Sequence, residues 1–274
     1  FVDSYANGET PVPCIKCNQT VKFSDLLNES KKLNADTLVT GHYAIRQGGL
    51  KGSKLYKAKD KKKDQSYFLF ATLQDQLDYV RFPLGSYFKS EIRKMAKDYN
   101  LVVSDKPDSQ DICFVPNGSY ADVIKKLKPE AVEPGEIVDI HGEQIGTHNG
   151  IINFTVGQRR GLGIGGGDPL YVLKLDAENR KVVVGPKSLL ATKTIKINDV
   201  NWIGDTAFDD VKIRDMNVRV RSTSQPKEAI IKPTGKTSAS VTLAMAEEGI
   251  APGQACVFYD KNSTRILGGG WITK

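Results

Sequence analysis

The stretch "FSDLLNESKKLNADTLVTGH", Phe23 to His42, decides how the first part of the chain folds. Its apolar residues recur at the spacing of one helix face, at Phe23, Leu26, Leu27 and Leu33. A short apolar run follows and ends at Gly41, which predicts a buried strand with a polar loop after it. A helix followed by such a strand is the α/β pattern, in which ligands bind beyond the carboxyl ends of the strands. Residues 65–80 are expected to form another helix.

The chain changes character after about residue 116. Residues 135–146 and 170–185 alternate apolar and polar side chains around turn residues, which predicts two hairpins. From about Lys187 onward, short strand-like runs with Gly and Pro between them predict a small antiparallel barrel. We therefore predict three domains: an α/β domain over residues 1–116, a small β-rich domain over 117–187 and a C-terminal antiparallel β-barrel over 188–274.

The charge of the chain suggests an anionic partner. Its 274 residues carry 39 Lys and Arg against 32 Asp and Glu, a net charge of +7, and its pI is about 9.0. Nucleic acid suits this charge, although the lysine-rich run at residues 57–65 is equally typical of a solvated loop. No stretch approaches the roughly 20 apolar residues of a membrane span. We expect a cytoplasmic protein without membrane association, and we expect it to be a monomer.

Two cysteines in "PVPCIKC", residues 11–17, are candidates for chemistry. Four cysteines are too few for a disulfide scaffold, and the cytoplasm keeps thiols reduced. A helix is expected at this point, and a helix N-terminus stabilises a thiolate, which would make Cys17 nucleophilic. Cys14 and Cys17 could equally be structural thiols or half of a zinc site. A zinc site needs about four ligands, however, and the sequence has no second C-x-x-C pair.

Other side chains suited to chemistry have roles that the pattern leaves open. Cys113 lies in an apolar run, where a cysteine is either a small core residue or a nucleophile. His42 is either a ligand or a structural histidine, and Asp64 is either a binding residue or a helix N-cap. Arg159 and Arg160 lie in a glycine-rich loop that is neither a G-x-G-x-x-G nor a Walker A loop. Basic side chains in such a loop suit contact with an RNA backbone.

Blocks of sequence run through the chain in a recognisable order. They are "PVPCIKCNQTVKF", "TGHYA", "KDQSYFL", "FPLG", "DSQDICF", "PGEIVD", "FTVGQRRGLGIG", "PGQACVFYD" and "LGGGWI". In these blocks the chain resembles the tRNA-specific 2-thiouridylases from about Thr10 onward. The resemblance implies part of a Rossmann-like PP-loop ATPase domain of α/β type, followed by a small β-rich domain that binds tRNA and a C-terminal antiparallel β-barrel.

The resemblance implies ATP-dependent transfer of sulfur to C2 of the wobble uridine, position 34, of tRNA. ATP, expected with Mg²⁺, adenylates the base oxygen, and a persulfide on one cysteine supplies the sulfur. A second cysteine attacks the persulfide and is left in a disulfide. By position, Cys17 resembles the nucleophile and Cys113 the persulfide carrier. The implied partners are tRNA and a sulfur-donor protein, either a cysteine desulfurase or a sulfur carrier.

The resemblance also implies contacts with ATP and with tRNA. Gly41 resembles the glycine that approaches ATP. The target base is expected to contact Val12, Pro13 and Cys14. Further tRNA contacts are implied at the following positions: His42, Lys63, Asp64, Gln65, Arg219, Arg221 and Gln254. No residue is implied as a metal ligand.

Two departures from the family pattern affect the expected activity. Many members have Asp where Cys14 stands, so the role of Cys14 is open, and its thiol is able to compete with Cys113 for a disulfide with Cys17. The family's S-G-G-x-D-S/T-S phosphate loop does not occur in these 274 residues. We therefore expect an N-terminally shortened member that does not thiolate tRNA by itself. The alternatives are a non-catalytic RNA-binding module and a zinc-stabilised protein built on Cys14 and Cys17.

Overall fold

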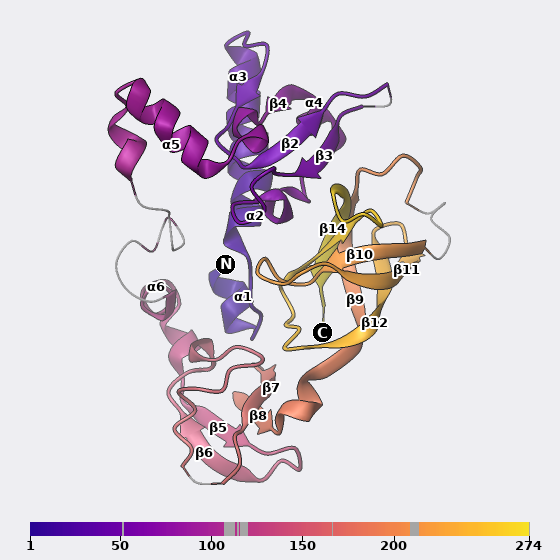
Figure 1. The fold of residues 1–274 in the computed structure, drawn as a ribbon. Coiled ribbons are helices and arrows are strands. Elements are labelled where there is room, and N and C mark those ends of the chain that lie inside the picture. Colours follow the sequence, from indigo (N-terminus) through magenta and orange to yellow (C-terminus); the bar gives the residue numbers. More distant parts are fainter. Residues whose placement is uncertain are drawn as a thin grey trace.

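The computed structural model of the chain describes residues 1–50, 52–106, 113, 115, 120–165, 167–208 and 214–273. Figure 1 shows three parts: helices with a short hairpin in indigo to magenta, a small sheet in pink, and a barrel in orange to yellow. The predicted order of an α/β part, a small β-rich part and an antiparallel barrel is therefore confirmed.

The first part is mainly helical. Its helices and turns are α1 (Val2–Ala6), α2 (Pro13–Cys17), the π-helix η1 (Asn18–Leu26), α3 (Leu27–Lys32), η2 (Ser66–Leu69), α4 (Gln74–Tyr79), η3 (Pro83–Ser86), α5 (Lys89–Asp98) and η4 (Val102–Asp105). Its strands are β1 (Leu38–Val39), β2 (Ala44–Gln47), β3 (Lys54–Lys57) and β4 (Val80–Arg81). Within the described residues, no helix has the length and apolar character needed to cross a membrane.

The helix predicted from the opening stretch is longer than expected. Helices α2, η1 and α3 follow one another without a break, from Pro13 to Lys32. Phe23 and Leu27 are buried as the apolar spacing predicts, whereas Leu33 is 80% exposed because the helix has ended. Asn34 then adopts a left-handed backbone with φ of 56°, a common way to end a helix. The predicted strand follows as β1, which pairs in parallel with β4.

The single helix predicted for residues 65–80 is wrong. The segment forms two shorter pieces, η2 and α4, because Leu73 is extended between them. The side chain of Asn201 donates hydrogen bonds to the carbonyls of Phe70 and Thr72, at 2.6 and 2.9 Å. A side chain from the barrel thus satisfies carbonyls that a continuous helix would have paired itself, which no local pattern in this segment reveals.

The middle part is a four-stranded sheet with short helices. Its elements are α6 (Tyr120–Leu127), η5 (Pro129–Val132), β5 (Gly135–Val138), β6 (Gln144–His148), η6 (Ile151–Asn153), β7 (Tyr171–Asp176), β8 (Lys181–Gly185) and η7 (Lys187–Leu190). The strand order is β6-β5-β8-β7, and both predicted hairpins are present. Alternating apolar residues of these strands, such as Ile137, Val172 and Val182, fill its core.

The last part is a closed barrel. Its strands are β9 (Ala191–Trp202), β10 (Arg214–Arg219), β11 (Lys227–Gly235), β12 (Ser238–Glu248), β13 (Ala255–Tyr259) and β14 (Arg265–Ile272). They pair in the order β13-β10-β11-β12-β9-β14, and a β13–β14 pairing closes the ring. Inward residues such as Ile197, Val241 and Phe258 are almost fully buried and form its core. Closure leaves these six strands without a free edge among themselves.

The first part shares a sheet with the barrel. Strands β2 and β3 form a hairpin, and β3 pairs with β14 through Tyr56 opposite Arg265 and Leu55 opposite Ile266. One hydrophobic cluster accordingly contains Leu55 from the hairpin and Val257 from the barrel. The barrel is therefore fixed against the helices that carry the candidate site. The domain limits at residues 116 and 187 stay a prediction.

Candidate active site

The two cysteines of "PVPCIKC" lie on one helix. The helix begins at Pro13, a favourable first residue because its φ is preset and its missing N–H would have no partner there. Cys14 and Cys17 are three residues apart, so their side chains lie on one side, a turn apart. Cys14 is exposed and Cys17 is half-buried. The expectation that Cys17 lies at the helix N-terminus is wrong, because the first turn, where the macrodipole acts, holds Cys14.

A third thiol, that of Cys113, joins this pair in space. Although the residue is exposed, neighbouring atoms partly desolvate the Cys14 thiol and thereby raise its pKa. The charges of Cys113 and Cys17 raise this pKa further, with Cys113 the stronger of the two. Cys113 therefore lies within electrostatic reach of Cys14 although it comes from a distant segment. Cys113 is exposed, so the alternative of a small core residue is wrong. We call Cys14, Cys17 and Cys113 the thiol cluster. All three are free thiols.

The fourth cysteine serves the core of the barrel. Cys256 is fully buried on β13 among apolar side chains. Burial raises the pKa of its thiol to about 12, so it stays protonated at neutral pH. It therefore has neither the access nor the thiolate needed for nucleophilic chemistry.

Lys22 and His42 form a polar pair beside the thiol cluster. Lys22 Nζ lies 3.4 Å from His42 Nε2, and Thr40 Oγ1 lies 2.8 Å from His42 Nδ1. His42 is 9% exposed and packs between Phe23 and Phe82, each at a ring distance of 6.0 Å. Burial, and secondarily the charge of Lys22, lowers the pKa of His42 to about 4, so the imidazole is neutral at pH 7. Its implied contact with tRNA stays a prediction.

Gly41 lies where the sequence pattern predicts a ligand-binding loop. It follows β1, and the backbone N–H of Thr40 just before it donates to the carbonyl of Arg81 at 3.0 Å. Gly41 is exposed, and a Cβ built there would meet only Leu84 Cδ1, at 3.7 Å. A ligand could approach this backbone closely. The contact of Gly41 with ATP that the resemblance implies stays a prediction.

Asp64 and Arg219 meet at the junction between the first part and the barrel. Arg219 Nη1 lies 3.4 Å from Asp64 Oδ2, and their side chains are 11% and 5% exposed. Arg219 also lies over the ring of Tyr67, at 5.4 Å, and 3.4 Å from the hydroxyl of Tyr259. Asp64 accepts hydrogen bonds from the N–H groups of Ala58 and Ser66 at 3.0 and 3.2 Å. These side chains hold two parts of the fold together, and their implied tRNA contacts stay predictions.

The neighbours of Asp64 differ in their partners. Gln65 Oε1 accepts a hydrogen bond from the N–H of Tyr43 at 2.9 Å, and the N–H of Gln65 donates to the carbonyl of Tyr43 at 2.8 Å. Gln65 therefore fixes the backbone that follows His42. Lys63 is half-buried, and its N–H donates to the carbonyl of Asp60 at 3.0 Å.

A barrel loop reaches the segment just before the cysteine helix. Gln254 Nε2 donates to the carbonyl of Thr10 at 3.2 Å, and the N–H of Thr10 donates to the carbonyl of Pro252 at 2.8 Å. Thr10 lies two residues before Val12, which makes Gln254 a neighbour of the expected target-base segment. Arg221, by contrast, pairs with Glu247 within the barrel, and Glu247 also pairs with Lys227.

Arg159 and Arg160 lie on the surface. Both side chains are exposed, as contact with an RNA backbone requires. The loop that carries them is held by Gln158, which accepts from the N–H of Thr155 and donates to the carbonyl of Arg160, at 3.0 and 2.9 Å.

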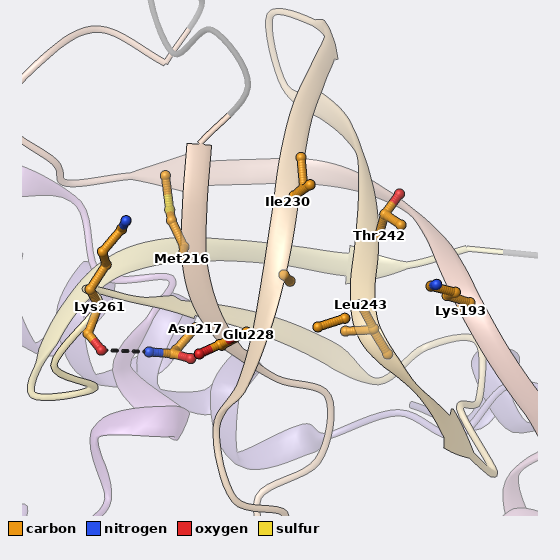
Figure 2. A pocket seen from close by; sticks show the side chains of 10 residues that line it. Lys193, Met216, Asn217, Glu228, Ile230, Thr242, Leu243 and Lys261 are labelled. Carbon is orange, nitrogen blue, oxygen red and sulfur yellow. Dashed lines mark hydrogen bonds between the residues drawn. The ribbon is translucent and has the colours of Figure 1, made fainter.

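A separate hollow of about 420 Å³ lies on the outside of the barrel, across strands β9 to β12 (Figure 2). At its edge Asn217 Nδ2 donates to the carbonyl of Lys261 at 2.7 Å. The described residues that line it do not include the predicted site residues. Within the part of the chain that the structure describes, no group of three or more His, Cys, Asp or Glu is arranged to hold a metal ion.

Lys22 was not predicted as a site residue. A lysine on a predicted amphipathic helix is normally solvated, and its only signal was its position five residues after Cys17. Tyr67 and Tyr259 were not predicted either, because they are ordinary core aromatics until Arg219 is placed beside them.

Comparisons with known proteins give the family. Three sequence models match successive parts of the chain. They are the tRNA methyl transferase HUP domain over residues 1–117, the tRNA methyl transferase PRC-barrel domain over 121–186, and the aminomethyltransferase beta-barrel domain over 192–272.

Curated relatives named tRNA-specific 2-thiouridylase MnmA match the whole chain. The protein of Jannaschia sp. (strain CCS1) is 57% identical over 276 residues, which cover 100% of this chain and 73% of the relative. That of Ruegeria sp. (strain TM1040) is 57% identical, covering 100% of this chain and 72% of the relative. That of Paracoccus denitrificans (strain Pd 1222) is 56% identical, covering 100% and 70%. With more than half of its residues identical to theirs along its length, the chain belongs to the tRNA-specific 2-thiouridylase family.

Proposed function

We propose that this chain acts in the transfer of sulfur to C2 of the wobble uridine, position 34, of tRNA. In this proposal Cys113 carries the sulfur as a persulfide and Cys17 releases it. The observation that carries the proposal is the thiol cluster, in which the exposed Cys113 from a distant segment lies within electrostatic reach of Cys14, one helical turn before Cys17. Persulfide relay needs two thiols that meet in space, one of them accessible to a donor. Membership of the family supports the same chemistry.

The relay balances as a thiol–disulfide exchange. The thiolate of Cys17 attacks the Cys113 sulfur of the persulfide, which forms a Cys17–Cys113 disulfide and releases the outer sulfur as hydrogen sulfide ion. The outer sulfur gains the two electrons that the two cysteines lose. The released sulfide is the nucleophile for C2 of the uridine, and a thiol reductant then restores both cysteines for the next cycle.

The proposal includes three components from outside the chain. ATP, with Mg²⁺, would supply the activation that turns the oxygen on C2 into a leaving group. A sulfur-donor protein, a cysteine desulfurase or a sulfur carrier, would load Cys113, whose exposure allows that contact. The tRNA is the substrate. Exposed Gly41 is the chain's own contribution toward ATP, and no step above depends on a phosphate site within these residues.

The RNA surface in this proposal includes the loop of Arg159 and Arg160, whose exposure and the net charge of +7 suit a phosphate backbone. Reversing both charges with Arg159→Glu and Arg160→Glu should weaken tRNA binding across sequences and reduce its salt dependence. The reversal of Lys97, which pairs with Asp105 on α5 and η4, is the matched control. If the double reversal binds tRNA as the unaltered chain does, this loop is not part of the RNA surface.

The decisive experiment maps cysteine linkages in the folded chain after mild oxidation, by mass spectrometry of peptides under non-reducing conditions. We expect a Cys17–Cys113 bridge, and we expect it to disappear in Cys17→Ser. Cys256 is the internal control, because a fully buried thiol forms a linkage only when the chain has unfolded. A Cys14–Cys17 bridge as the sole product would contradict the relay. That result would favour the interpretation of the two cysteines in "PVPCIKC" as a local redox or metal pair.

A further inference from the structure

Lys22 occupies an unusual place on the cysteine helix. It is the fifth residue of η1, eight residues after Cys14. With about 3.6 residues per turn in an α-helix, eight residues make slightly more than two turns. The wider π-helical turn takes up this excess. Cys14 and Lys22 therefore lie on nearly the same face of one continuous helix. The π-helical stretch thus places the side chain of Lys22 on the same helix face as that of Cys14.

The partner of Lys22 leaves its charge unbalanced. The ammonium has only donors, so Nε2 of the neutral His42 is the acceptor at 3.4 Å. The other ring nitrogen, Nδ1, must then carry the proton and donate to Thr40 Oγ1 at 2.8 Å. A neutral imidazole fixes the lysine in position without neutralising it, as a carboxylate would. His42 itself is held by Phe23 and Phe82, so the whole arrangement is rigid.

A cation, Lys22, acts on Cys14 in the thiol cluster. Besides burial, the charged groups that act on Cys14 are Cys113 and Cys17, which oppose its ionisation, and Lys22, which favours it. A thiolate on either neighbour opposes ionisation of Cys14, and a neighbouring cation favours it. Lys22 is the only cation among the described groups that act on Cys14.

We propose that Lys22 is the cation that favours the thiolate of Cys14 in the thiol cluster, and that His42 is a positioning residue that holds Lys22 on the helix face of Cys14. The inference rests on the proposed sulfur transfer, because Cys14 lies within the thiol cluster that carries out that reaction and one helical turn before Cys17. It assigns His42 a role through Lys22 that does not require the imidazole to contact tRNA.

The test measures the alkylation rate of each cysteine by iodoacetamide from about pH 6 to about pH 10, with peptides quantified by mass spectrometry. Lys22→Met removes the charge and keeps the length of the side chain. We expect it to move the Cys14 profile to higher pH and to slow alkylation at neutral pH by about tenfold for each unit of that shift. Lys22→Arg should largely restore the wild-type profile. His42→Leu should shift the profile in the same direction by less, because the lysine loses its acceptor.

Two controls make the result specific. Lys16→Met removes a charge from the same helix, but Lys16 lies 5.0 Å over the ring of Trp271 and bonds Gln19, so the Cys14 profile should not move. Cys256 reports folding, since it stays unalkylated only in the folded barrel. An unchanged Cys14 profile in Lys22→Met, with Cys256 still protected, overturns the inference. If Lys22→Met exposes Cys256 to alkylation, the Cys14 profiles of His42→Leu and Lys22→Arg decide the question. A His42→Leu profile identical to that of Lys22→Arg then rejects the inference.

Alkylation needs neither ATP nor tRNA, so this inference and the proposed function fail separately. A shifted Cys14 profile without a Cys17–Cys113 bridge would leave Lys22 in its role and reject the relay. A Cys17–Cys113 bridge that forms equally well in Lys22→Met, together with an unshifted Cys14 profile, would support the relay and reject the role of Lys22.

Discussion

Two regions of the molecule hold charged and reactive side chains. The regions differ in how exposed these side chains are and in whether their charges are paired. In the thiol cluster, Cys14 and Cys113 are exposed, and the ammonium of Lys22 faces a neutral imidazole. At the junction with the barrel, Asp64 and Arg219 pair at 3.4 Å with almost no exposure. Buried groups that satisfy one another hold a structure together. Exposed groups with an unbalanced charge are available to a ligand or a reaction.

The comparison changes how the predicted RNA contacts are understood. Sequence resemblance implies tRNA contacts at Asp64 and Arg219 alike, yet the structure pairs them with each other. The structure therefore supports an indirect role, in which the pair sets the position of the barrel relative to the cysteine helix. Arg159 and Arg160, by contrast, are free to meet a phosphate backbone directly.

The largest stability effect should come from Tyr67, at the centre of the junction. Tyr67 is 1% exposed, and its hydroxyl donates to the carbonyl of Ala255 at 2.9 Å. Tyr67→Ala should lower the free energy of unfolding by about 3–5 kcal/mol, because it empties a buried aromatic site. Denaturant titration measures the change. Tyr99→Ala is the control, since Tyr99 is 77% exposed, and should cost less than about 0.5 kcal/mol. Equal losses in both variants would contradict the buried junction.

The next largest effect is a loss of stability in mild acid that depends on His42. The folded state has a pKa of about 4 for this group, below its ordinary value of 6.5. Its contribution is complete above about pH 6.5, where neither state binds the proton, and is lost as the pH falls toward 4, because the unfolded state protonates first. Between pH 7 and pH 5 the loss should be about 2 kcal/mol. In His42→Gln the stability should fall less over this range, whereas a wild-type slope in that variant rejects the buried neutral histidine.

Much of the fold follows from local patterns, and the exceptions have a common cause. The periodicity around Phe23 and Leu27 predicts their helix, and alternation predicts the hairpins of the middle sheet. The pairing of β3 with β14 joins segments about 200 residues apart, and a strand pattern does not specify its partner. The break at Leu73 depends on Asn201 in the same way.

The candidate site divides similarly. Its residue types were predictable, because cysteines at residues 14, 17 and 113 are conspicuous in a chain with only four. The neighbours of each side chain were not. The sequence could not show that Cys113 lies near Cys14, that His42 is buried against Lys22, or that Arg219 is paired with Asp64. Each of these contacts joins distant segments and depends on the finished packing.

A smaller effect should separate the buried ion pair from an exposed one. We expect Asp64→Asn and Arg219→Met, measured singly and together by denaturant unfolding, to show a coupling of about 1–3 kcal/mol, because the two side chains share one buried contact. The pair of Lys32 with Glu29 on α3, whose side chains are 70% and 61% exposed, is the control and should show little coupling. A coupling no larger at the junction than on α3 would mean that Asp64 and Arg219 do not fix the barrel. The tRNA contacts that the resemblance implies for these two residues would then be favoured over the indirect role.

The smallest stability effect should come from the thiol cluster itself. Cys17→Ser replaces the sulfur of a half-buried side chain with a hydroxyl that water still reaches, so the free energy of unfolding should change by less than about 0.5 kcal/mol. The same change should abolish the Cys17–Cys113 bridge and, with it, sulfur release. Cys256→Ser provides the contrast, because it places a hydroxyl in the fully buried barrel core and should cost about 1–3 kcal/mol. A large loss of stability in Cys17→Ser would make Cys17 a structural residue. The distinction between a reactive thiol cluster and a junction that stabilises the fold would then not hold for Cys17, the residue on which the proposed relay depends.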